Sequence, residues 1–233
     1  ASLYSARDLA AAKWRLENYN PEKIIYVAGH EQELYFQQIF RTLGLMDYPE
    51  DKFLHVSYGL VTKDGKKLST RAGEVIFAED ILGEAVKKAK DDETVGMGAV
   101  IYNLLSQGRE NDVAFDWDKM LNVQGNSAPY IQYGYVRAFS ILEKANFQFA
   151  IFPLQQGEAL LKDINPSEGK LIKLMAFYPE TVRQAQKLNN PHLIATYLNN
   201  FVQEFNRFYA DSPVIHAEEK IKAASTTEYT VSC

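Results

Sequence analysis

The chain has 233 residues, 46% of them hydrophobic and 24% charged, a composition typical of a globular protein with a sizeable core. It lacks the roughly 20-residue apolar run of a membrane span and an opening signal peptide, and its single cysteine, Cys233, excludes internal disulfides and a cysteine-based metal site. A reducing, cytoplasmic setting is expected. The net charge of −5 disfavours nonspecific coating of nucleic acid by the protein, but it permits a local surface that binds one particular RNA.

The first part of the chain alternates between expected helices and strands. Residues 5–18 have the periodicity of an amphipathic helix, and residues 23–28 are a nearly continuous apolar run that ends at Gly29, as in a buried parallel strand. A second helix is expected over residues 31–43 and a second strand over residues 53–58. This order predicts a wound α/β sheet, whose ligands lie beyond the carboxyl ends of the strands.

After about residue 78 the pattern predicts helices only. They are expected over residues 78–91, 93–106, 130–144, 153–163, 168–188 and 192–210. A broad apolar stripe on the last of these is typical of core packing. The tail from residue 217 onward loses this periodicity, and we expect it to be frayed.

A polar, cationic loop at residues 66–73 follows the second strand and an Asp-Gly turn. Its lysines, hydroxyls and arginine can neutralise and hydrogen-bond a polyphosphate. Taken by itself, the stretch is better explained as a solvated hairpin loop, because Asp-Gly turns beside lysines are common. Motifs elsewhere in the sequence decide between a phosphate-binding loop and a solvated hairpin loop.

Three polar side chains are candidates for a pocket that binds a cation. Tyr4 and Asp8 lie one helical turn apart, and Gln32 begins the second helix just beyond a strand end. A carboxylate, a phenol and an amide together suit a guanidinium. Alternatively, Asp8 only complements the helix dipole and Tyr4 is a boundary aromatic.

A polar loop at residues 124–129 leads into a helix with Tyr130, Tyr133 and Arg137 on one face. Aromatic rings and an arginine suit unstacked RNA bases and phosphates, although ordinary helix packing explains the same pattern. Gly134 inside this helix indicates the close approach of another backbone or of a ligand. Glycine-rich nucleotide loops, a Walker motif, a nucleophile elbow and a histidine metal cluster are all missing from the sequence.

Six short sequence motifs occur in an order and spacing that are known from one protein family. They are residues 4–8, 26–32, 55–59, 67–71, 115–117 and 125–133. With them, residues 1–219 resemble the C-terminal half of an arginyl-tRNA synthetase, a class I aminoacyl-tRNA synthetase. The resemblance implies an α/β part followed by an all-α part, that is, a partial Rossmann-like parallel sheet and then a helical-bundle anticodon-binding domain.

The resemblance also implies domain limits and roles. Residues 1–118 correspond to the later part of the catalytic domain with its connecting helices, residues 119–219 to a truncated anticodon-binding domain, and residues 220–233 to a tail foreign to the family. The residues implied to bind arginine are Tyr4, Asp8 and Gln32. Those implied to bind ATP are His55, Val56, Lys67 and Ser69, with Lys67, Ser69 and Arg71 as the catalytic signature that clamps the phosphates. Those implied to contact tRNA are Gln124, Asn126, Tyr130 and Arg137.

The implied reaction joins arginine to tRNA(Arg) at the expense of ATP, which enters with Mg²⁺ as its substrate complex. The arginine carboxylate attacks the α-phosphate, and the resulting arginyl group passes to the terminal adenosine of tRNA that is already bound. Positioning and electrostatics suffice for such chemistry, so no covalent nucleophile and no protein-bound metal are expected. The resemblance further implies a parent protein that is monomeric and independent of membranes.

Three departures from the family pattern matter. Thr70 replaces the second lysine of the phosphate signature and is followed by Arg71. The first class I signature, His-x-Gly-His, and the N-terminal tRNA-elbow domain are missing, and the terminal helices do not follow residue 219. We therefore expect a fragment that is inactive alone. The alternatives are a non-catalytic tRNA-binding module and another class I synthetase such as the cysteine enzyme, although the latter characteristically needs zinc-binding cysteines.

Overall fold

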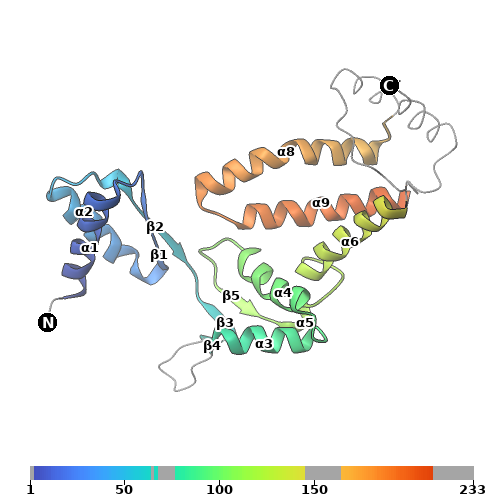
Figure 1. Ribbon diagram of the computed structural model, residues 1–233, viewed down its shortest axis with the longest axis horizontal. Coiled ribbons are helices and arrows are strands. Elements are labelled where there is room, and N and C mark those ends of the chain that lie inside the picture. Colours follow the sequence, from blue (N-terminus) through green and yellow to red (C-terminus); the bar gives the residue numbers. More distant parts are fainter. Residues whose placement is uncertain (1–2, 64–65, 68–76, 145–163, 212–233) are drawn as a thin grey trace, which may run out of the picture.

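The computed structural model describes residues 3–63, 66–67, 77–144 and 164–211 (Figure 1). The first described elements are α1 (Tyr4–Tyr19), β1 (Ile24–Gly29), the 3₁₀ helix η1 (His30–Gln32), α2 (Glu33–Leu45), the 3₁₀ helix η2 (Glu50–Lys52), β2 (Phe53–Tyr58), β3 (Val61–Lys63) and β4 (Lys66–Lys67). They are followed by α3 (Ala78–Lys88), α4 (Glu93–Leu105), β5 (Val113–Phe115), α5 (Trp117–Met120), α6 (Ala128–Lys144), α8 (Pro166–Leu188) and α9 (His192–Asp211).

The N-terminal lobe is built on two parallel strands. β1 and β2 pair in register from Ile24 against Phe53 to Gly29 against Tyr58, which confirms the expected parallel arrangement. Both helices of the lobe contribute to its core, whose buried residues are Ala12, Ile24, Ile39, Leu43 and Phe53. Burying such apolar side chains stabilises a fold by about 1.5–3 kcal/mol each.

A second small sheet has the order β4-β3-β5. β3 pairs antiparallel with β4 and parallel with β5, with Val61 opposite Val113. The expectation of helices only after residue 78 was therefore wrong at β5. A strand of three residues has too little periodicity to be recognised, and its conformation is stabilised by pairing with a strand some 50 residues earlier.

The remaining described chain is helical, and α8 and α9 form a long hairpin that α6 joins on one side (Figure 1). α8 begins at Pro166 because Asn165 caps it: the Glu168 amide donates to Asn165 Oδ1 at 2.9 Å, and the Asn165 amide donates to Glu168 Oε2 at 2.9 Å. The helix expected over residues 153–163 lies outside the described residues. Within the described ranges no helix is both long and apolar enough to cross a membrane.

Small residues allow the helices to approach closely. A Cβ atom built on Gly96 of α4 would lie 2.7 Å from the Val86 backbone of α3, and one built on Gly134 of α6 would lie 2.6 Å from Val202 Cγ1 of α9. Real Cβ atoms almost never approach other atoms so closely. A close approach at Gly134 is thus confirmed, but the approaching group is the Val202 side chain of α9 and not the backbone or ligand that was expected.

Candidate functional site

The carboxyl ends of β1 and β2 meet at one edge of the first sheet, where Gly29 is paired with Tyr58. Gln32 ends the 3₁₀ helix that directly follows β1, and β3 and β4 follow β2. Gln32, which is expected in the pocket, and the hairpin of β3 and β4, called the lysine hairpin below, therefore follow the sheet at the same edge. This is the edge where open α/β sheets bind their ligands.

Asp8 on α1 is held by a tyrosine on α2. The Tyr35 hydroxyl donates to Asp8 Oδ2 at 2.5 Å, and this hydrogen bond, followed by burial and the charge of Asp8, raises the pKa of Tyr35 to about 12. The charge of Asp8 also acts on the Tyr26 hydroxyl of β1, so the carboxylate lies beside that strand. A carboxylate has about four acceptor sites, which leaves Asp8 able to accept a guanidinium as well.

Tyr4 and Gln32, the other two residues expected in the pocket, both have exposed side chains. Tyr4 is 83% exposed, and among the described residues neither side chain forms a hydrogen bond with Asp8 or with the other. The structure joins Asp8 to Tyr35, which sequence analysis missed. The signal for it was the helical spacing of three residues from Gln32.

His55 and Val56 lie in the middle of β2. His55 Nε2 is 3.2 Å from the Ala28 carbonyl oxygen, to which it donates in the tautomer protonated there, and its ring centroid is 4.7 Å from that of Phe36. Val56 is half-buried and pairs with Val27 of β1. Both are thus fixed in the strand close to the ligand edge.

The lysine loop is described only in part. Lys67 is in β4 and pairs with Thr62 of β3, so the stretch starts as an antiparallel hairpin. Ser69 and Arg71 lie outside the described residues. Over the described ranges no group of three or more histidine, cysteine, aspartate or glutamate side chains could hold a metal ion.

The polar loop before α6 is held to the neighbouring helices. The Gln124 amide donates to Asn122 Oδ1 at 2.8 Å, and Asn126 Oδ1 accepts a 2.5 Å hydrogen bond from the Tyr102 hydroxyl of α4. Burial raises the pKa of Tyr102 to about 12. The buried Ser127 hydroxyl donates to the Asn122 carbonyl and caps α6 by accepting from the Tyr130 amide at 3.3 Å.

The tyrosine and arginine face of α6 is turned toward α9. Arg137 donates from Nη1 to Asn206 Oδ1 at 2.5 Å and from Nη2 to the Tyr133 hydroxyl at 3.1 Å. Its guanidinium carbon lies 4.6 Å from the ring centroid of Tyr133 and 5.1 Å from that of Tyr209, and Asn206 Nδ2 donates to the Tyr130 hydroxyl at 3.0 Å. Arg137 and Tyr130 thus take part in helix packing, while Tyr133 remains 53% exposed.

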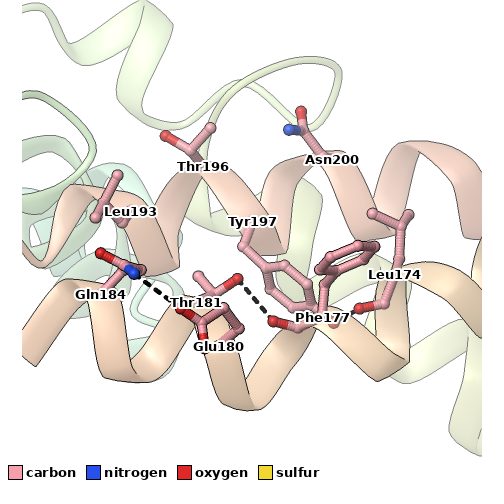
Figure 2. A pocket seen from close by; sticks show the side chains of 9 residues that line it. All are labelled: Leu174, Phe177, Glu180, Thr181, Gln184, Leu193, Thr196, Tyr197 and Asn200. Carbon is pink, nitrogen blue, oxygen red and sulfur yellow. Dashed lines mark hydrogen bonds between the residues drawn. The ribbon is translucent and has the colours of Figure 1, made fainter.

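A shallow groove of about 390 Å³ runs between α8 and α9, far along the chain from Asp8 (Figure 2). Its lining residues are Leu174, Phe177, Glu180, Thr181, Gln184, Leu193, Thr196, Tyr197 and Asn200. Their polar groups are largely engaged: Tyr197 donates to the Leu174 carbonyl at 3.0 Å, and Gln184 donates to Glu180 at 2.8 Å. The groove therefore offers apolar surface rather than reactive groups.

Comparison with known proteins matches both halves of the chain. Residues 1–117 match the family described as tRNA synthetases class I (R), catalytic domain, and residues 131–226 match the DALR anticodon binding domain. The chain is 34% identical to an arginine–tRNA ligase of Alkaliphilus metalliredigens over 96% of the chain and 42% of that protein, and 39% identical to one of Clostridium acetobutylicum over 90% and 39%. It therefore spans about two fifths of the length of these relatives.

Solved structures agree with this fold. The arginyl-tRNA synthetase of Thermus thermophilus matches with a TM-score of 0.76 at 22% identity, covering 90% of this chain and 41% of that one. That of Plasmodium falciparum matches with a TM-score of 0.73 at 25% identity, covering 91% and 38%. A partial parallel sheet followed by a helical anticodon-binding domain is thus the shared architecture.

Proposed function

We propose, because this chain belongs to the class I arginyl-tRNA synthetase family, that it contributes the arginine-binding and phosphate-binding side of an arginine–tRNA ligase together with its tRNA-binding helices. The observation that carries the proposal is the Asp8 carboxylate of α1, which the Tyr35 hydroxyl of α2 holds by a 2.5 Å hydrogen bond. An oriented carboxylate at a ligand edge selects a cationic substrate.

Asp8 binds the guanidinium of the substrate arginine in this proposal. Its second oxygen stays available while Oδ2 accepts from Tyr35, and a planar guanidinium presents the donors that a carboxylate accepts. Tyr4 and Gln32, whose side chains are exposed, supply further polar contacts to the ligand. A hydrogen bond to a charged group contributes about 1.5–3 kcal/mol, which suffices to distinguish arginine from a neutral analogue.

The ATP substrate, bound with Mg²⁺, occupies the same edge. His55 and Val56 lie beside the adenine, and Lys67, Ser69 and Arg71 bind the phosphates. A carboxylate oxygen of arginine attacks the α-phosphorus, and the bond to the bridging oxygen breaks, so that pyrophosphate leaves with the released charge. Cations of the lysine loop stabilise that charge, which is the main contribution a protein can make to this step.

The helical part binds tRNA(Arg) through the loop and helix face that contain Gln124, Asn126, Tyr130 and Arg137. The hydrogen bonds of Asn126 to Tyr102 and of Arg137 to Asn206 pre-organise this surface. Exposed aromatic area on the same face, as at Tyr133, suits an unstacked base. Binding to splayed bases needs only such local features, which explains how an acidic chain can bind RNA.

Isothermal titration of the 233-residue chain with L-arginine and its neutral isostere L-citrulline tests the arginine site. Asp8→Asn should weaken arginine binding by about tenfold or more and leave citrulline binding unchanged. Glu17→Gln is the matched control, because Glu17 is on the same helix and also accepts a tyrosine hydroxyl, from Tyr48 at 3.1 Å. Equal arginine affinities of the wild type and Asp8→Asn would remove Asp8 from the site.

A further inference from the structure

The segment between α4 and β5 lies directly against the junction between β2 and β3. The Gly59 amide donates to the Arg109 carbonyl at 2.8 Å, the Leu60 amide donates to Asp112 Oδ1 at 2.7 Å, and the Val113 amide donates to the Leu60 carbonyl at 2.8 Å. These three bonds join residues about 50 positions apart in the sequence. They bind the junction to the start of the second sheet.

Gly59 allows this contact. A Cβ atom at this position would lie 2.2 Å from the Asn111 carbonyl oxygen and 2.4 Å from its carbon. These are backbone atoms, so the clash could be relieved only by separating the two segments. The junction is therefore built for close backbone contact.

The side chain of Arg109 fastens the end of β2 itself. Its Nη1 donates to the Ser57 carbonyl at 2.6 Å and lies 3.2 Å from Ser57 Oγ, and its Nη2 is 3.0 Å from Glu110 Oε1. Ser57 pairs with Ala28, one residue before the strand ends. The Arg109 side chain is only 21% exposed, so its charge-assisted bonds to Ser57 are little screened by water, whereas Glu110 is 58% exposed.

We propose that Arg109 is a positioning residue for the lysine hairpin. The hairpin begins in β3, and β3 is joined to the ligand edge only through the two residues Gly59 and Leu60. Arg109 fixes the end of β2, and the neighbouring Asp112 and Val113 fix the start of β3. The direction in which the β3 and β4 backbones leave the ligand edge follows from this anchor.

An arginine suits this role better than a lysine. Its planar group reaches the Ser57 carbonyl and Glu110 from two different nitrogens at once, whereas an ammonium on a flexible stem has no fixed fork. The inference rests on the proposed phosphate-binding function of the hairpin. Its structural step, the anchoring of the junction, is independent of that function.

Hydrogen exchange by mass spectrometry and titration with MgATP, both on the complete 233-residue chain, test the inference. In Arg109→Met, amides of residues 59–63 and 113–115 should exchange about tenfold faster, while those of β1 and α2 stay unchanged. The affinity for MgATP should fall about fivefold, as expected for a lost positioning contact, while that for arginine is preserved. Arg109→Lys should lie between the wild type and Arg109→Met in both measurements.

Arg41→Met is the control, because Arg41 lies in the same lobe and its side chain is 71% exposed and bonded to Glu50 at 2.7 Å; it should change neither measurement. Unchanged exchange at the junction in Arg109→Met would overturn the anchoring. Faster exchange with unchanged MgATP affinity would overturn the positioning role. A wild-type chain that binds no MgATP would refute the proposed phosphate-binding function, and the exchange result would still decide whether Arg109 anchors the junction.

Discussion

Gly134→Ala tests the packing of α6 against α9, which supports the proposed RNA-binding face. The added methyl would lie 2.6 Å from Val202 Cγ1 and 3.1 Å from Cγ2. Val202 is only 6% exposed, so it has little room to move. The substitution therefore sets two effects of opposite sign against each other.

Alanine in place of glycine inside a helix stabilises it by about 1 kcal/mol. Overpacking a close contact costs about 1–3 kcal/mol, so a mid-range cost of about 2 kcal/mol predicts a net destabilisation of about 1 kcal/mol. Val202→Ala alone should cost about 2 kcal/mol because it removes two buried methyl groups and leaves a cavity. In that background Gly134→Ala should stabilise by about 1 kcal/mol, which is a coupling of about 2 kcal/mol between the two sites.

Urea denaturation followed by far-UV circular dichroism measures the free energy of unfolding of the wild type, both single variants and the double variant. Gly83→Ala is the control, since a Cβ at that helical position in α3 meets nothing within 4 Å. It should stabilise by up to about 1 kcal/mol in either background. If Gly134→Ala behaved like Gly83→Ala with Val202 present, the close approach of α9 at Gly134 would be refuted.

Two further predictions concern Tyr35 and Arg137. The tyrosinate absorbance difference between the wild type and Tyr35→Phe should titrate near pH 12, because the pKa of Tyr35 is raised to about 12; titration near pH 10 would contradict the bond to Asp8. Since this folded pKa lies above the unfolded value of about 10, the stability that Tyr35 contributes is present below pH 10 and is lost as the pH rises through 12. Arg137→Ala should weaken tRNA binding and reduce the salt slope by about one phosphate contact. Asn206→Ala, which keeps the arginine, should preserve the slope, and an unchanged slope in Arg137→Ala would leave Arg137 with a packing role only.

The local sequence pattern predicted those features of the fold that depend mainly on neighbouring residues. β1 is a short apolar run ended by glycine, β2 is rich in strand-forming residues, and their order with the helices predicted the parallel pairing. Asp8 could be singled out because it shares a helix face with Tyr4. Periodicity also located α3, α4, α6, α8 and α9 within a few residues.

Contacts between segments distant in the sequence could not be predicted from the local pattern. Tyr35 is 27 residues from Asp8, and Asn206 is 69 residues from Arg137, and no local rule specifies which partners meet across such a separation. β5 was missed because its strand conformation depends on β3. The sequence pattern did not single out Arg109, and only the folded chain places it beside Ser57.

The most direct test of the account is the binding of anticodon stem-loops to the 233-residue chain, measured by fluorescence anisotropy at fixed salt. A stem-loop with the anticodon of tRNA(Arg) should bind at least about tenfold more tightly than the same stem-loop with an unrelated anticodon, since a wrong base at a hydrogen-bonded position leaves polar groups unpaired at a cost of about 1–3 kcal/mol. Equal affinity for the two stem-loops would contradict the proposed role of this chain in binding tRNA(Arg).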